Sequence, residues 1–257
     1  MPRKGSQRFA VFCCFFSKKK TSALLQISPW ANSAGMNMLA PPRTKLTIEV
    51  ILDLVCPWCF LGTKRLLRTL RQRPGVLFEL QWRPFLLNPD MPRAGIARGD
   101  YLVRKFGSAD RAERLHGTVA ALGRAEGITF QFDRIAQAPS SVNAHRLVAL
   151  ASRYGVAREL VEALFSAHFC EGEDIGDARC LLRIAHDAGL PLAPTRALLA
   201  SDEGADQVHA ENLHAHRMGV NGVPCFILAQ RHAIAGAQEA EVFERLIDVA
   251  LNEASEL

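Results

Sequence analysis

The sequence predicts an α/β protein in which a block of helices interrupts one β-α-β … α-β-β-α unit. Three observations carry this prediction. Residues 46–87 have the pattern of a strand, a helix and a second strand. Residues 98–200 then show nearly unbroken helical periodicity, and residues 204–257 return to a helix, two short strands and a final helix. The two flanking parts must therefore meet in space to form one sheet.

The first half of the unit begins with LTIEVILDLV (46–55), an apolar and β-branched run that is typical of a buried strand. After Cys59, the stretch FLGTKRLLRTLRQRP places leucines on one face and basic residues on the other. This pattern predicts an amphipathic helix that ends at Pro74-Gly75. The alternating run VLFELQWRPFLL (76–87) predicts a second strand, and so short a crossover indicates that the two strands are parallel.

The helical block and the second half follow from the same kind of periodicity. Apolar residues recur at three-to-four spacing over 98–200, and glycines divide this stretch into about six helices. Residues 205–218 predict another helix, VPCFIL and RHAIAGA predict a hairpin, and residues 239–254 predict a final amphipathic helix. We therefore divide the body into a first α/β half, a helical insertion and a second α/β half: 46–97, 98–203 and 204–257.

Residues 1–45 differ from the rest of the 257-residue chain because they carry eight basic residues and no acidic one. The remaining 212 residues hold 23 basic against 26 acidic side chains, so the body gives no reason to expect a nucleic-acid partner. No apolar run reaches the roughly 18 residues of a membrane span. We interpret the extension as an unstructured tail or as translation from a start upstream of Met36 or Met38. A cytoplasmic protein is then expected, with export or organelle targeting as the alternative if the extension is real.

The motif Cys56-Pro57-Trp58-Cys59 lies where the first predicted strand ends and the first helix begins. Free backbone N–H groups and the helix dipole favour a thiolate at Cys56, which makes it the expected attacking sulfur, with Cys59 one turn further on. Pro57 suits a first helical turn, and Trp58 could cover the site or contact a client protein. A Cys-x-x-Cys motif beside a β-α-β pattern indicates a thioredoxin-like redox site.

Two other interpretations of the cysteine pair remain. A zinc site commonly needs four ligands, but one pair is present, and the nearest histidine cluster, His209, His214 and His216, lies on a distant polar helix. No metal is therefore expected, and the histidines are interpreted as solvated. The pair could instead be inert core thiols, which is our interpretation of the isolated Cys170 and Cys180.

The second candidate segment is GVNGVPCFIL (219–228), in which a proline opens a strand. Proline cannot donate a ladder hydrogen bond, so it must lie at a strand start or an edge. In a thioredoxin-like fold this loop lies beside the cysteine pair, and we predict a cis Val223–Pro224 bond with the Val223 backbone free to pair with an extended substrate. Asp53, three residues before Cys56, could relay a proton from Cys59 or simply hydrogen-bond the loop.

These motifs together resemble the DsbA family of thiol–disulfide oxidoreductases, and more narrowly its FrnE-like branch. The resemblance spans residues 48–250 and rests on DLVCPWCFLG, WRPFLLNPDMP, NAHRL, EGEDIGDA, LASDEGA and GVNGVPCFIL. It implies a thioredoxin fold with an inserted helical domain, Cys56 as nucleophile, Cys59 as resolving thiol and Pro224 as the cis-proline. It implies client proteins or small thiols and disulfides as partners. No cofactor is implied beyond the redox-active disulfide, with glutathione as a possible co-substrate. Relatives usually have an aromatic residue after the proline, so Cys225 is either a third thiol near the pair or a tolerated small apolar residue.

We therefore expect an enzyme that acts by dithiol–disulfide exchange, as an oxidase, a reductase or an isomerase according to the potential of the pair. The first alternative is a glutathione-dependent isomerase or kappa-type glutathione transferase, a class with serine in place of Cys56. In that class Asn143, His145 and Arg146 could line a small-molecule pocket, whereas the simpler interpretation gives them a helix start and a surface face. The second alternative is a non-catalytic protein-binding module.

Overall fold

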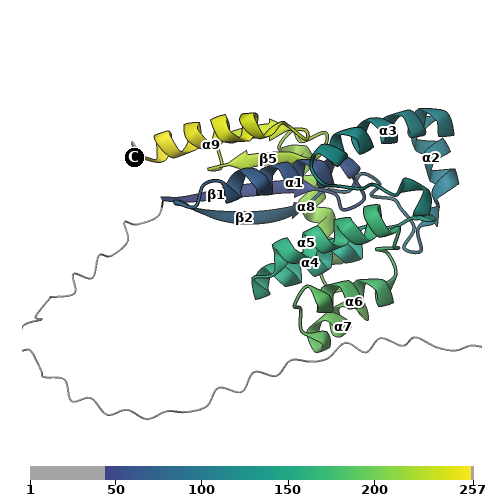
Figure 1. Cartoon of the computed structure of the whole chain (residues 1–257). Coiled ribbons are helices and arrows are strands. Elements are labelled where there is room, and N and C mark those ends of the chain that lie inside the picture. The colour runs from purple at the N-terminus through teal and green to yellow at the C-terminus, as the bar shows by residue number, and fades with distance from the viewer. Residues whose placement is uncertain (1–43, 256–257) are drawn as a thin grey trace, which may run out of the picture. The chain divides into compact units, whose positions relative to one another are not determined.

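The computed structural model of the protein describes residues 44–255, and Figure 1 shows the arrangement of its elements. The expectations for the basic extension, including Met36 and Met38, concern residues 1–43 and lie outside the described residues. Thr44 and Lys45, which we had assigned to the extension, form the start of the first strand.

One four-stranded sheet, in the order β2-β1-β5-β6, joins the two halves of the chain. The parallel pair is β1 (Thr44–Leu52) with β2 (Val76–Pro84), as the short crossover predicts. The antiparallel strand β5 (Cys225–Leu228) pairs with β1, so that Ile51 lies opposite Cys225, and β6 (His232–Ala235) completes the hairpin. The prediction that the two halves form a single sheet is confirmed.

Helices cover both faces of this sheet. On one face, α1 (Pro57–Arg71) and α9 (Ala240–Ser255) pack on the alternate residues of β1 and β5 that point toward them. On the other face, α8 (Ala205–Arg217) contributes Ala215 to a small cluster with Ile51. Because β1 is buried on both faces, its sequence is a mostly apolar run and does not alternate strictly between apolar and polar residues.

The helical block contains the six helices that the periodicity predicts. They are α2 (Arg98–Phe106), α3 (Ala109–Ala125), α4 (Val142–Tyr154), α5 (Ala157–Ser166), α6 (Ala178–Asp187) and α7 (Leu192–Leu199). The sequence did not predict the π-helical turn Ala167–Glu171 that extends α5, the 3-10 turn Phe132–Arg134, or the two-residue strands β3 (Ile96–Ala97) and β4 (Gln137–Ala138). These segments are too short to show a period.

Both strands of the first half end earlier in the structure than the sequence predicts. β1 ends at Leu52 and β2 ends at Pro84, although the apolar runs continue to residues 55 and 87. The extra apolar residues, such as Leu54 and Leu86, are buried in loops and not in the sheet. One of these loops, directly after β1, turns back through a hydrogen bond from the Cys56 N–H to the Asp53 carbonyl (3.0 Å) and thereby positions the cysteine motif.

One apolar core runs from the sheet into the helical block. Phe60 of α1 stacks on Phe165 of α5 with ring centroids 5.1 Å apart, and Phe169 packs beside them. On the sheet side, Phe226 of β5 meets Phe243 of α9 edge to face.

No helix within residues 44–255 combines the length and the apolar character needed to cross a bilayer.

Candidate active site

The Cys-Pro-Trp-Cys motif forms the N-terminus of α1, as the sequence predicts. Cys56 is the N-cap residue in an extended conformation, and Pro57 occupies the first helical position. The Cys56 carbonyl accepts hydrogen bonds from the N–H groups of Cys59 (3.0 Å) and Phe60 (3.2 Å), so the second cysteine lies within the first turn. Trp58 is half-buried and packs against the core, which leaves part of its ring beside the motif.

Both sulfurs of the motif are buried and unbonded to each other. Cys56 is 4 % exposed and Cys59 is completely buried. Burial raises the pKa of the Cys59 thiol well above its ordinary value, and the hydrogen bond and charge of Cys56 raise it further. The charge of Asp53 also raises the Cys59 pKa, while a backbone hydrogen bond from Asp53 opposes the shift. Cys59 therefore stays protonated near neutral pH and needs a base before it can attack.

The proline loop of the second half lies directly against the motif. The Val223–Pro224 peptide bond is cis, and the Cys56 Sγ donates to the Val223 carbonyl at 3.7 Å. On its other side Pro224 approaches α1 where that helix has Gly62, because a Cβ at this position would lie 2.9 Å from the Pro224 Cγ. Segments 167 residues apart in the chain thus meet at one sulfur.

Asp53 is buried behind the cysteines and is held by the loops around it. Its carboxylate accepts hydrogen bonds from the N–H groups of Leu87 (2.8 Å) and Val55 (3.4 Å). Its Oδ1 also lies 3.5 Å from the Nε2 of His145. Burial alone would raise the pKa of Asp53, but His145, the Leu87 N–H and the Ser141 hydroxyl hold it below its usual value. The carboxylate is therefore ionised beside a protonated thiol.

The surface-face interpretation of the Asn143, His145 and Arg146 segment is wrong for His145 and Arg146. α4 does begin here, but His145 is 4 % exposed and Arg146 is 2 % exposed. Arg146 donates to the Asn143 side chain and to the carbonyls that end α7, including Leu198 and Ser201. His145 is turned toward Asp53. Both side chains are turned inward because α4 has α5, α7 and α8 packed around it, which no local pattern reveals.

His145 and Arg146 also line a largely apolar cavity of about 290 Å³ between β2, α4 and α8. Leu52, Trp82 and Val208 contribute to its wall, and neither cysteine of the motif does. Two of the three predicted pocket residues therefore line a cavity, but its wall does not include the sulfurs. The contacts of the sulfurs, and not this cavity, define the candidate site.

Cys225 does not lie among the residues that contact the motif. Its side chain packs in the cluster of Ile51, Phe85 and Ala215 on the α8 face of the sheet, whereas Cys56 and Cys59 belong to the core of the opposite face. Alternation along β5 produces this separation, since Phe226 points toward the motif's core and its neighbour must point away. Burial raises the pKa of the Cys225 thiol.

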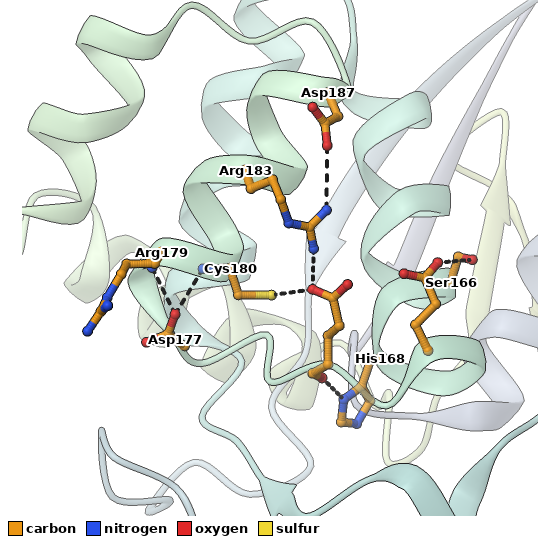
Figure 2. A network of polar contacts seen from close by, with 9 residues as sticks. Ser166, His168, Asp177, Arg179, Cys180, Arg183 and Asp187 are labelled. Carbon is orange, nitrogen blue, oxygen red and sulfur yellow. Dashed lines mark hydrogen bonds and ion pairs between the residues drawn. The ribbon is translucent and has the colours of Figure 1, made fainter.

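Cys170 and Cys180 are half-buried and pack against the core from its edge, so the interpretation of these two residues as core hydrophobes holds only in part. Figure 2 shows Cys180 in a polar network on α6, where its Sγ donates to the Glu173 carboxylate (2.9 Å), which also pairs with Arg183. Burial and the Glu173 charge raise the pKa of Cys180 to about 12, which makes this thiol unreactive near neutral pH.

The three histidines of α8 are exposed, and the described residues contain no cluster of three or more His, Cys, Asp or Glu side chains able to hold a metal ion.

The fold and the motif define a class, the thioredoxin-like proteins with a Cys-x-x-Cys pair at a helix N-terminus and a helical insertion. Within that class, residues 47–248 match the family model of the DSBA-like thioredoxin domain, and the chain belongs to this family.

Three individual proteins are similar to this chain over most of its length. A crystal structure described as a probable DsbA oxidoreductase from Streptomyces coelicolor is 30 % identical with a TM-score of 0.74, over 81 % of this chain and 91 % of that one. The uncharacterized protein YwbO of Bacillus subtilis is 25 % identical over 78 % of this chain and 94 % of its own length. The cytosolic disulfide reductase DsbM of Pseudomonas aeruginosa, solved with GSH, shares the fold at 18 % identity and a TM-score of 0.58, over 80 % of this chain and 99 % of that one.

Proposed function

We propose that this protein catalyses thiol–disulfide exchange through Cys56 and Cys59. The observation that carries the proposal is the placement of Cys56 at the first turn of α1, with its sulfur against the Val223 carbonyl and a buried Cys59 behind it. Family membership supports the same chemistry. The FrnE-like branch, a cytoplasmic location and the oxidase, reductase or isomerase direction are expectations within this proposal.

The proposed reaction proceeds in two exchanges. The Cys56 thiolate attacks one sulfur of a substrate disulfide, so that a mixed disulfide forms and the other substrate sulfur leaves as a thiolate. Cys59 then loses its proton and attacks the Cys56 sulfur, which releases the second substrate thiolate and leaves a Cys56–Cys59 disulfide. A reducing thiol returns the pair to its starting state, and the reverse sequence transfers a disulfide to a reduced client.

The neighbouring residues support these steps in our proposal. Asp53 is ionised, and both its charge and its backbone act on the Cys59 thiol, so we assign it as the group that accepts the Cys59 proton. The backbone at Val223 pairs with the extended substrate, while Pro57 and Trp58 stiffen and cover the motif. Cys225 supports the sheet beneath Val223 and takes no part in exchange.

A glutathione-dependent isomerase is the second candidate. The cavity lined by His145 favours it, as does the fold of a 2-hydroxychromene-2-carboxylate isomerase, which is 15 % identical with a TM-score of 0.63 over 82 % of this chain and 98 % of that one. The cavity does not reach the sulfurs, and both cysteines are present, which favours exchange. In the exchange proposal glutathione acts as the reducing co-substrate.

Reduction of insulin by the full chain with dithiothreitol tests the proposal. We expect turnover in the wild type and a loss of at least about a hundredfold in Cys56→Ser, because that variant lacks the attacking sulfur. Cys225→Ser is the matched control, since it replaces a buried thiol on the other face of the sheet. Wild-type inactivity together with glutathione-dependent isomerisation or conjugation would favour the second candidate. Inactivity in every assay would leave a protein-binding module.

A further inference from the structure

We infer that His145 is a positioning residue for the resolving step, because it holds the Asp53 carboxylate in the state that accepts the Cys59 proton. This inference rests on the proposed function and extends it to a residue outside the cysteine motif and the proline loop. His145 touches neither sulfur, so it acts through Asp53 alone.

The first observation is that Asp53 needs a partner beyond its neutral donors. The carboxylate is 1 % exposed, and the Leu87 N–H, the Val55 N–H and the Ser141 hydroxyl around it are all neutral. A buried carboxylate without a cationic or strongly donating neighbour takes up a proton at neutral pH. The imidazole of His145, whose Nε2 lies 3.5 Å from Oδ1, is the side chain that faces this oxygen.

The second observation is that the Nε2 atom of His145 has no competing polar partner. Its Nε2 is fully buried and has no hydrogen-bond partner in the described part of the chain, so the approach to Asp53 is its one polar contact. Buried polar atoms of purely structural side chains are nearly always hydrogen-bonded. The backbone of His145 is fixed in the first turn of α4, where its N–H donates to the Ser141 carbonyl (3.0 Å).

The titratable groups around Asp53 come from three elements. Cys59 of α1 interacts with its charge, His145 faces it from α4, and His168 of the π-helical turn contributes at longer range. The His168 Nδ1 is already engaged with the Glu173 carbonyl (3.1 Å), and burial lowers the His168 pKa to about 4, so this residue is neutral. Asp53 therefore depends on His145 and not on the second buried histidine.

Loss of the imidazole has a defined consequence for the reaction. Without the imidazole, the effect of burial on the Asp53 pKa is no longer balanced. The pKa of the carboxyl therefore rises, and the group is protonated when the mixed disulfide forms. Cys59 keeps its proton, and the second exchange slows. The first exchange does not involve Asp53, so attack by Cys56 continues at its normal rate.

The test uses an aromatic disulfide, dithiobis(nitrobenzoate), added at less than one equivalent to the reduced full chain. Attack by Cys56 releases the first coloured thiolate and resolution by Cys59 releases the second, so stopped-flow absorbance separates the two steps. Near neutral pH we expect His145→Leu to slow the second release by about tenfold or more, with the first release within about twofold of the wild type. The second release should recover as the pH rises, because Asp53 ionises again.

Three further variants make the result specific. His145→Gln keeps a neutral N–H donor and should restore much of the rate, with a smaller upward shift of the pH midpoint. His168→Leu, the matched buried histidine, should leave the ratio of the two rates unchanged. Asp53→Asn should slow the second release, and adding His145→Leu to it should have little further effect, since the two residues act in one chain.

An unchanged second release in folded His145→Leu would overturn the inference, as would an equal slowing of both releases or strict additivity with Asp53→Asn. If the Leu variant does not fold, the pH profile of the Gln variant decides alone, and an unshifted midpoint contradicts us. Failure of the proposed function looks different, because the wild type would then release one thiolate per reagent molecule or none.

Discussion

The five cysteines within residues 44–255 show how one residue type takes different roles according to its surroundings. Cys56 and Cys225 are almost equally buried, yet only Cys56 lies at a helix N-terminus with a carbonyl from a distant loop at its sulfur. Cys180 donates to a carboxylate, and its raised pKa removes it from thiol chemistry. Burial therefore does not distinguish Cys56, the proposed nucleophile, from Cys225, whereas backbone position does.

Cys225→Ala tests this separation at the residue scale. We expect the variant to release two thiolates per molecule of dithiobis(nitrobenzoate), as the wild type does, because Cys225 lies on the opposite face of the sheet. Its free energy of unfolding in urea should fall by about 1 kcal/mol, since a buried heavy atom is lost without replacement. A changed thiolate yield in this variant would place the third thiol in the site after all.

At the scale of elements, the site depends on how closely α1 approaches the proline loop. Gly62 lies one turn after Cys59, and its missing side chain leaves room for Pro224 and for the backbone of Ala237. That close approach holds the Val223 carbonyl at the Cys56 sulfur. The glycine in FLG thus has a packing role that the amphipathic pattern of the helix does not reveal.

Gly62→Ala is expected to destabilise the protein by about 1–3 kcal/mol, because the added methyl would lie 2.9 Å from Pro224 and 3.2 Å from the Ala237 Cα. Exchange activity should fall with it as the loop moves away from Cys56. The matched control is Gly117→Ala in α3, where a Cβ meets nothing within 4 Å and helix propensity favours alanine by up to about 1 kcal/mol. Urea unfolding of both variants measures the difference, and equal effects would count against the packing role.

The elements could be predicted well from the sequence because their periods are local. Each long helix and each strand of the sheet has an apolar pattern within its own segment, and the cysteine motif and the proline of β5 are recognisable in the same way. The pairing of His145 with Asp53 has no such local signal, since the two residues come from different elements and a histidine in NAHRL looks like any helix-start residue. The orientation of Cys225 could have been predicted from the alternation of β5, had its register with β1 been known.

For the molecule as a whole, the sheet and the helical block are joined by one core and one buried ion network. Arg65 of α1 is 3 % exposed and pairs with Glu126 at the end of α3 (3.0 Å). The same guanidinium donates to the Ala237 carbonyl (2.8 Å) and pairs with Glu239 just before α9 (2.8 Å). We propose that the insertion is a separate unit in chain topology but unfolds together with the sheet.

Glu126→Gln tests this coupling. We expect a loss of about 3 kcal/mol in the free energy of unfolding, because the change removes the buried carboxylate that pairs with Arg65 and leaves this charge only the exposed Glu239. Glu159→Gln, which breaks the exposed pair with Arg158, should cost less than about 1 kcal/mol. Far-ultraviolet circular dichroism should show one transition in each variant, and a separate transition for the helical block would contradict the coupled unfolding.

The most direct test of the account is the thiolate yield of a single turnover, with the resulting disulfide mapped by mass spectrometry. With dithiobis(nitrobenzoate) below one equivalent, we predict two thiolates per reagent molecule and a disulfide that links Cys56 to Cys59 within one peptide. Cys59→Ser should release one thiolate and retain a nitrobenzoate adduct on Cys56. A stable adduct on the wild-type protein, or a disulfide that involves any other cysteine, would contradict exchange at this pair.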